Sequence, residues 1–545
     1  MVAFAACKKG NNNPGSKPTT GATFTFVKAT INSISYSGSG IYNIPTSPVI
    51  SIVFSGPIDT ALVASNLYFS GGGASVPKSW TLSNDSTLNI RPQAALTHLG
   101  NYSVVISTGL RSTADSALKN GVVLNFVTAI DSTAKFPQIT DSALLTLVEQ
   151  QTFSYFWDLG DPTSGMARER ASGTTVTTGG SGFGVMAMLV AVQRNFISRT
   201  DALNRIMTIV NFLTTKASNY HGAFSHWLNG TTGATIPFST QDNGGDIVET
   251  SYMMQGLLCA RQYFNSTTDP TEISLRTEIN NLYNNVNWNW YRQNGQNVLY
   301  WNWSPNYNFA INVQVQGWCE ALITYVLAAS STVDSFAIPK IVYDDGWAHN
   351  GGMKNGSSYY GVPLPLGPTD GGPLFFAHYS FLGINPNGLS DAYANYWTQD
   401  TAHARINYLY CVANPGRFNG YSSSCWGLTA SDEQNGYSAH SPTNDDGVIS
   451  PTAAISSLPY TPTESMNALR FFYYTLGDKI WGEYGFIDAF NLSGLWFDND
   501  YLAIDQGPEI VMIENYRSGL LWNLFMSCPE VQQGMKNLGF SGPNL

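Results

Sequence analysis

The chain has 545 residues, of which 43% are hydrophobic, 13% aromatic and 12% charged. This length exceeds one ordinary domain, and the apolar fraction is too high for a disordered protein. Lys and Arg number 26 against 37 Asp and Glu, a net charge of −11, which argues against nucleic-acid binding and favours a neutral substrate. No run of about 18 apolar residues occurs, so no membrane-spanning helix is predicted. Low charge with 14 Trp, 29 Tyr and 51 Gly is a composition common among secreted carbohydrate-active proteins.

The first residues predict a lipid anchor. Phe4-Ala5-Ala6-Cys7 resembles a bacterial lipobox, in which small residues precede a cysteine that is lipidated after cleavage, and a polar tether follows it. The basic start and most of the apolar core of a signal are missing, so the start looks truncated. We expect residues 1–21 to be a signal remnant and tether, with lipidation at Cys7 and attachment to the bacterial outer membrane on either face. A free cysteine in a ragged terminus is the alternative.

The other five cysteines show no CxxC spacing. Cys259 and Cys319 lie in apolar helical runs and are predicted core residues. Cys411 and Cys425 could form one bridge, but the set resembles neither a disulfide framework nor a zinc site. We expect no metal and no organic cofactor.

Residues 22–128 read as a small all-β domain. Short segments rich in Val, Ile, Thr and Phe are separated by Gly, Asn, Asp and Pro, as at 23–27, 49–54, 87–90, 102–106 and 122–127. About seven such strands in ~107 residues suit an immunoglobulin-like sandwich, and residues 49–59 resemble bacterial Ig-like domains of the surface-layer type. The domain has one Trp, Trp80, and no acidic cluster. A spacer is therefore favoured over a second sugar-binding site.

After a linker at 129–140, residues 141–545 have helical periodicity. Apolar helical patterns occur at 141–157, 183–196, 201–216, 249–264, 274–288, 313–329, 374–382, 396–412, 463–476 and 513–526. Roughly ten to twelve helices joined by long Gly-, Pro- and Trp-rich loops favour an all-α (α/α)6 toroid. A TIM barrel would need eight β-branched strands alternating with the helices, and these are not found.

Three acidic motifs lie where polar loops meet helices. Asp246 and Glu249 share one face of a helical first turn. Glu320 enters a strongly apolar helix, where burial would raise its pKa as a general acid requires. Asp505 lies in a loop bounded by Gly and Pro that leads to further carboxylates. Each motif alone could be a helix cap or a buried salt bridge, but three of them flanked by Trp and Gly weaken that reading.

Other chemistries are poorly supported. The sequence has no GxGxxG, Walker A, HExxH or GxSxG motif, and its seven His are scattered. His221 and His226, five apart, do not share a helical face. Trp301, Trp303, Trp347 and Trp496 are candidates for stacking on sugar, with core packing as the alternative for each one.

Residues 141–540 resemble the glucoamylase-like family of Bacteroidetes and Proteobacteria, glycoside hydrolase family 144. The resemblance rests on runs that include Gly317-Trp-Cys-Glu-Ala-Leu-Ile, Gly371-Gly-Pro-Leu-Phe-Phe-Ala-His-Tyr, Gly436-Tyr-Ser-Ala-His-Ser-Pro, Trp481-Gly-Glu-Tyr-Gly-Phe-Ile-Asp and Ala503-Ile-Asp-Gln-Gly-Pro. These runs contain further expected substrate-binding residues: His378, Tyr379, Tyr437 and His440. Residues 168–184 depart from the shorter version that many relatives carry.

The resemblance implies an inverting hydrolase of β-1,2-glucan that acts inside the chain or releases sophorose, with essential acids at Asp246, Glu249, Glu320 and Asp505. Another toroid-type glucosidase and a lipid-anchored glycan-binding protein are the alternatives. Because Glu320 has apolar neighbours, we expect it to be the acid. Asp246, Glu249 and Asp505 compete for the base, with Asp505 slightly favoured and the other two holding sugar and water. We expect a monomer that binds no nucleic acid and meets the membrane only through its anchor.

Overall fold

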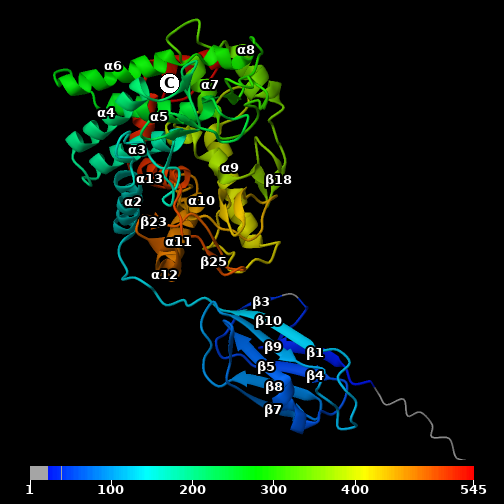
Figure 1. Cartoon of the computed structure of the whole chain (residues 1–545). Coiled ribbons are helices and arrows are strands. Elements are labelled where there is room, and N and C mark those ends of the chain that lie inside the picture. The colour runs from blue at the N-terminus through cyan, green and yellow to red at the C-terminus, as the bar shows by residue number, and fades with distance from the viewer. Residues whose placement is uncertain (1–22, 39) are drawn as a thin grey trace, which may run out of the picture. The chain divides into compact units, whose positions relative to one another are not determined.

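The computed structural model describes residues 23–38 and 40–545, which form two compact units, residues up to Asp131 and Ser132–Leu545 (Figure 1). The tether and Cys7 lie outside the described residues. Among the described residues, no helix has the length and apolar character needed to cross a bilayer.

The first unit is a β-sandwich of two five-stranded sheets, in the orders β2-β1-β4-β8-β7 and β3-β10-β9-β5-β6. Its strands are β1 Phe26–Ile31, β2 Ile34–Ser35, β3 Ile41–Ile44, β4 Ile50–Phe54, β5 Leu67–Gly71, β6 Ala74–Ser75, β7 Lys78–Asn84, β8 Thr87–Pro92, β9 Asn101–Ile106 and β10 Val122–Thr128, with a helical turn α1 at Val63–Asn66. In β4 every second side chain is buried, because alternate residues of a strand face the space between the sheets. The predicted Ig-like sandwich therefore has a conventional apolar core.

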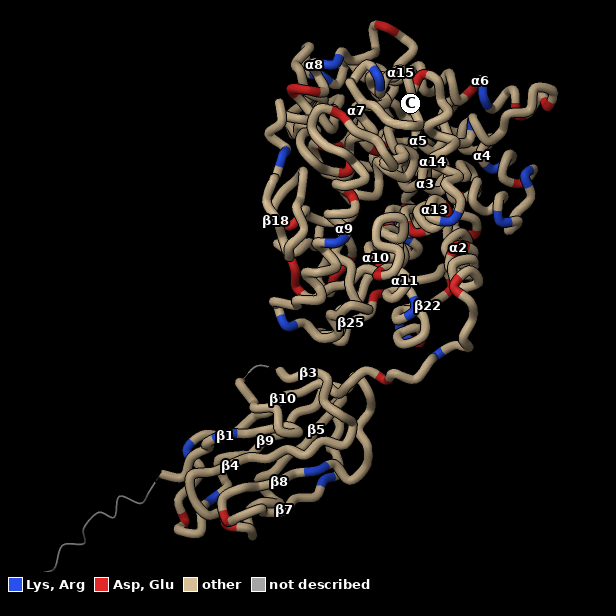
Figure 2. The backbone as a smooth tube through the Cα atoms, turned by 180° about the vertical axis from the view of Figure 1, so that it is seen from behind, with Lys and Arg blue, Asp and Glu red and all other residues tan. Residues whose placement is uncertain are grey.

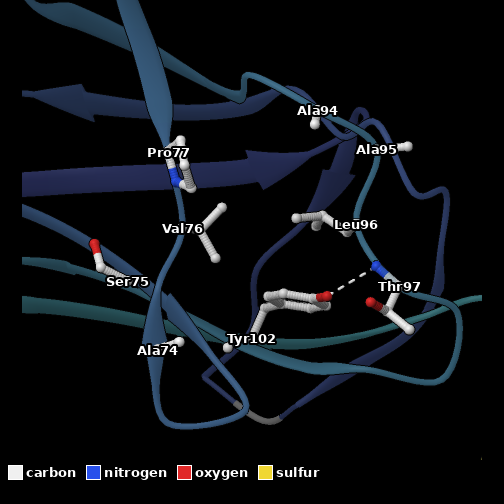
Figure 3. A pocket seen from close by; sticks show the side chains of 10 residues that line it. Ala74, Ser75, Val76, Pro77, Ala94, Ala95, Leu96, Thr97 and Tyr102 are labelled. Atoms are coloured by element: carbon white, nitrogen blue, oxygen red, sulfur yellow. Dashed lines mark hydrogen bonds between the residues drawn. The ribbon is translucent and has the colours of Figure 1, made fainter.

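The sandwich has a shallow pocket of about 200 Å³ (Figure 3). Val76, Pro77 and Leu96 line it together with Tyr102, whose hydroxyl accepts a hydrogen bond from the Thr97 amide at 2.9 Å. None of its lining residues is acidic, basic or histidine. This pocket has no group for acid–base chemistry.

The second unit is helical. Its helices are α2 Asp141–Asp158, α3 Thr178–Gln193, α4 Arg199–Thr215, α5 Ile247–Tyr263, α6 Pro270–Asn285, α7 Leu322–Ala329, α8 Lys340–Val342, α9 Tyr396–Ala413, α10 Pro451–Ile455, α11 Pro462–Arg470, α12 Gly477–Ile480, α13 Ala503–Ser518, α14 Leu520–Met526 and α15 Pro529–Leu538. Helix α3 packs against both α5 and α13 and is buried along most of its length. The chain backbones approach closely here: a Cβ on Gly182 would lie 2.2 Å from the Tyr252 carbonyl oxygen. This contact fixes α5, which carries two of the predicted acids.

Short β-pairs lie in the loops between these helices. They are β11 Thr175–Thr177, β12 Asn219–Tyr220, β13 Ala223–Phe224, β14 Trp227–Asn229, β15 Thr235–Ile236, β16 Gly245–Asp246, β17 Asn302–Trp303, β18 Ser358–Tyr359, β19 Val362–Pro363, β20 Ala430–Glu433, β21 Gly436–Ala439, β22 Trp481–Gly482, β23 Gly485–Phe486, β24 Phe490–Asn491 and β25 Trp496–Phe497. Asp and Glu positions, red in Figure 2, lie beside α13 and α9 within this unit as well as on its edges.

Three sequence predictions differ from this structure. The predicted helix 313–329 begins only at Leu322, and the predicted helix 374–382 is two 3-10 turns, Leu374–Ala377 and Ser380–Leu382. Gly317 has φ +80°, a left-handed conformation that a continuous helix does not allow. Conversely, Asp505 lies not in a loop but in the first turn of α13, which contains Gly507 and Pro508. The bridge that the sequence left open between Cys411 and Cys425 does not form in this structure, where both cysteines are free and buried.

Candidate active site

Asp246 is the N-cap of α5 and is fully buried. Its Oδ1 accepts hydrogen bonds from the amides of Val248 at 3.0 Å and Glu249 at 2.9 Å. Its Oδ2 accepts from Trp301 Nε1 at 3.3 Å and lies 3.1 Å from His226 Nδ1. Both oxygens are thus occupied by protein donors, which suits a residue that positions its neighbours.

Glu249 follows in the first turn of the same helix and is 6% exposed. Its Oε2 accepts from the Gly179 amide at 2.7 Å and from Thr177 Oγ1 at 3.4 Å. A Cβ on Gly179 would lie 2.6 Å from this oxygen, so the close approach requires glycine. Burial raises the pKa of Glu249, and the neighbouring His226 acts against that rise.

His226 links these two carboxylates. Its Nδ1 faces Asp246, and its Nε2 lies 3.9 Å from Glu249 Oε1. Burial alone would lower the pKa of His226, but the Glu249 and Asp246 carboxylates outweigh it and raise the pKa to about 9. The sequence analysis did not select His226, because its five-residue spacing from His221 places the two histidines on different helical faces. The fold brings His226 to the start of α5.

Glu320 lies in the turn before α7, just ahead of the N-cap Ala321, and not inside the helix. Ser380 stabilises this turn, because its hydroxyl donates a hydrogen bond to the Glu320 carbonyl and accepts one from the Ile323 amide at 3.0 Å. The side chain is only half-buried. Burial raises the pKa of Glu320, and the charges of Glu249 and Asp246 raise it further. A hydrogen bond from its own backbone amide acts in the opposite direction, and the resulting pKa is about 7. Glu320 therefore holds a proton close to neutral pH and remains accessible.

Tyr379 connects the two sides of the site. Burial raises the pKa of its hydroxyl, and Asp505, Tyr437, Glu320 and Glu249 raise it further. All four groups therefore lie close enough to Tyr379 to act on it electrostatically. Its ring packs against Phe183 of α3 and Tyr252 of α5.

Asp505 forms the other side of the site with Asp488, a residue that the sequence analysis did not select. The two residues line the same small cavity, and each carboxyl group acts on the pKa of the other, so the pair favours a state in which one of the two is protonated. Burial is the main cause that raises both pKa values, to about 7 for Asp488 and well above the usual range for Asp505. A cavity of about 10 Å³ adjoins the pair, with Thr452, Gln506 and Glu509 also in its wall.

A second layer of charged groups surrounds this pair. Arg170 binds Asp432 at 2.8 Å and Glu169 at 2.9 Å, and the Asp432 amide donates to Asp488 at 2.7 Å. Oxygen atoms of Asp432, Asp488 and Asp498 lie within 4.8 Å of one another, as do ligand atoms of the group Glu433, His440 and Asp446. In the first group the Arg170 guanidinium already supplies positive charge to Asp432.

The predicted aromatic residues divide into two sets. Trp301 binds Asp246, and Trp303 lies in β17 within an aromatic cluster with His221 and Trp290; Tyr437 is 48% exposed beside Asp505. These three remain candidates for contact with substrate.

The other predicted binding residues are placed differently. Trp347 is fully buried against Tyr325, and His378 is 2% exposed and bonded to Ser457 Oγ at 3.0 Å, so neither offers a surface to a sugar. His440 is likewise 2% exposed, with Nδ1 3.4 Å from Asp446. Trp496 is half-buried in the β24–β25 pair. Burial argues against sugar contact for Trp347, His378 and His440. Core packing uses the same residue types as sugar binding, so the sequence alone did not separate the two roles.

Comparison with known proteins agrees with this architecture. Residues 312–529 match the family model described as "Putative glucoamylase", and residues 29–128 match the bacterial Ig-like domain model. A crystal structure from Bacteroides uniformis with the same glucoamylase description is 54% identical, with TM-score 0.74, and covers 75% of this chain and 100% of that one.

Two further relatives have more specific names. The endo-β-1,2-glucanase of Chitinophaga pinensis, in complex with sophorotriose and glucose, is 51% identical, with TM-score 0.73, over 75% of this chain and 100% of that one. The exo β-1,2-glucooligosaccharide sophorohydrolase (non-reducing end) of Parabacteroides distasonis is 45% identical over 423 residues, 73% of this chain. The match spans 58% of that relative's length. The chain therefore belongs to the glucoamylase-like family of glycoside hydrolases, the family 144 type, and carries an N-terminal bacterial Ig-like domain.

Proposed function

We propose that this protein is a glycoside hydrolase that cleaves β-1,2-glucan or its oligosaccharides. The observation that carries the proposal is Glu320, a half-buried carboxyl whose pKa is raised to about 7 beside Glu249 and Asp246. A general acid needs this combination of a retained proton and access to the glycosidic oxygen. The names of the Chitinophaga and Parabacteroides relatives support the β-1,2 linkage.

The proposed reaction inverts the anomeric carbon. Glu320 protonates the leaving oxygen, while a second carboxylate removes a proton from the attacking water on the opposite side of the sugar. The Asp488–Asp505 pair is the proposed base, because a pair that shares one proton keeps one negative charge and can accept another proton. Asp246 and Glu249 hold sugar and water in this proposal, and the amides of Val248, Glu249 and Gly179 fix the orientation of the two carboxylates.

The proposed catalytic fold is an (α/α)6 toroid. Long helices joined by loops with short β-pairs support it. The proposed reaction either cleaves inside the glucan chain or releases sophorose. A toroid-type glucosidase of another specificity and a non-catalytic glycan-binding protein are the competing functions.

Incubation of the protein with linear β-1,2-, β-1,3-, β-1,4- and α-1,4-glucans tests the function. We expect new reducing ends only from β-1,2-glucan, and NMR of the first product should show the α-anomer. The product lengths distinguish internal cleavage from sophorose release. Binding of β-1,2-glucan without new reducing ends would support the glycan-binding alternative.

We also propose that Cys7 carries a lipid that attaches the protein to the outer membrane. The small residues before Cys7 and the polar residues after it support this. Labelled palmitate should enter the full-length protein and not its Cys7→Ala variant; incorporation that survives this change would refute the anchor.

A further inference from the structure

His226 contacts both acids at the start of α5 at once. Its Nδ1 lies 3.1 Å from Asp246 Oδ2, and its Nε2 lies 3.9 Å from Glu249 Oε1. A neutral imidazole carries one N–H, so it can present a donor to one carboxylate only; an imidazolium presents a donor to each. The Asp246 contact has the length of a hydrogen bond and the Glu249 contact that of an ion pair, an arrangement that favours the protonated form.

The surroundings of His226 favour that form. The acidic side chains that act on it are Glu249 and Asp246 of the β16–α5 segment and Asp242 of the preceding loop. Its ring packs on Phe238 at 4.5 Å and on Trp227 at 5.6 Å, and its side chain is 25% exposed. The site thus holds a cation that is aromatic-packed on one side and faces two carboxylates on the other.

Two carboxyl groups here compete for one proton, Glu249 and Glu320. Burial favours the neutral form of both. Each accepts from one backbone amide, that of Gly179 for Glu249 and its own for Glu320, and Asp246 acts on both as a like charge. They differ because Glu249 also faces His226. The groups facing Glu320 from neighbouring elements also include Tyr252, Tyr379 and Cys319, which are neutral near pH 7.

We propose that His226 is a positioning residue that, as an imidazolium bound to Asp246 and facing Glu249, directs the catalytic proton onto Glu320. This inference rests on the proposed hydrolase function. Without the cation, Glu249 would hold a proton over part of the working pH range. Glu320 would then lose the proton in some molecules while Glu249 held one. Fewer molecules would have the productive state, in which Glu320 is protonated and Glu249 is ionised.

The test compares His226→Gln with His226→Arg in the full-length protein, by kcat and KM on β-1,2-glucan from pH 4 to pH 9. In His226→Gln the acidic limb of kcat/KM should move to higher pH by about one unit, and kcat should fall more than KM rises, by about tenfold or more at the wild-type optimum. His226→Arg keeps the charge and should recover part of the activity and the wild-type position of the acidic limb. The matched control is His349→Gln, which removes an exposed histidine and should leave the profile unchanged.

An independent measurement follows the imidazole itself by NMR. His226 should remain protonated above pH 8 in the wild type, and its pKa should fall in Glu249→Gln, which removes one facing charge. A His226 signal that titrates near the ordinary value, about 6.5, or a folded His226→Gln protein with an unshifted acidic limb, would overturn the inference. Wild-type protein without activity on any glucan would count against the proposed function instead, while the NMR titration would still test His226.

Discussion

The two sides of the candidate site bury carboxylates in opposite ways. On the α5 side, Asp246 and Glu249 are met by amides, an indole N–H and the His226 ring. On the α13 side, Asp505 meets another carboxyl, Asp488. Donors favour the ionised form of a buried acid, whereas a second carboxyl favours a shared proton. The same residue type thus meets hydrogen-bond donors on one side and a second carboxyl group on the other. Glu249 acts electrostatically on Glu320, which in turn acts on Tyr379.

The largest expected effect is at Glu320. Glu320→Gln keeps the shape of the side chain and removes its proton, so activity on β-1,2-glucan should fall by about 10³-fold. A substrate with an activated leaving group needs less protonation and should lose less activity. Equal losses on both substrates would assign Glu320 to binding rather than to acid catalysis.

Asp488→Asn tests the carboxyl pair on the α13 side. An amide at this position can donate to Asp505 and removes the like charge, so Asp505 should ionise at lower pH. We expect the acidic limb of the activity profile to move to lower pH, with about a tenfold loss of kcat at neutral pH because the pair no longer shares the proton. The surface variant Asp478→Asn is the control; an unchanged acidic limb would exclude proton sharing in catalysis.

Asp246 separates the capping role from the role of its charge. Asn is as good an N-cap as Asp, whereas Ala is poor. The free energy of unfolding of Asp246→Ala, measured by denaturant titration, should therefore be about 1 kcal/mol lower than that of Asp246→Asn. Both variants should lose activity, since both remove the charge that binds His226. Wild-type activity in Asp246→Asn would reduce this residue to a helix cap.

The smallest effect concerns stability against pH. The pKa of Glu320 is raised on folding, so its stabilising contribution is complete below the unfolded value of about 4.5 and is lost as pH rises through about 7. Glu320→Gln lacks this loss. Its melting temperature relative to wild type should therefore increase between pH 5 and pH 8 by a few degrees at most; a constant difference across this range would contradict the raised pKa.

Local patterns predicted the elements whose two faces differ. Strand β4 alternates between buried and half-buried residues, and α4 carries apolar residues at helical spacing after the N-cap Ser198. The pattern failed at the start of α13. Around Asp505, Gly507 and Pro508 indicated a loop, yet this segment is helical because it packs against Phe183 of α3.

The sequence patterns identified some residues of the candidate site and missed others. Asp246, Glu249, Glu320 and Asp505 stood out because each lies in a motif where a polar loop meets a predicted helix, flanked by Trp and Gly. Asp488 and His226 gave no such signal, and Trp347 and His378, selected in the sequence analysis, are buried in the structure. Asp488 and His226 each act with a residue from another segment of the chain. Asp488 lies beside Asp505 of α13, and His226 contacts Asp246 at the start of α5.

By itself the sequence determined the division into a β-sandwich and a helical unit, the family, and the candidate acids Asp246, Glu249, Glu320 and Asp505, since periodicity and motif spacing are local properties of the chain. Only the tertiary structure decided which acids share protons, which face a cation and which aromatic residues remain accessible. Protonation and access depend on burial and on the nearest charges, and those neighbours are joined by folding rather than by adjacency in the chain.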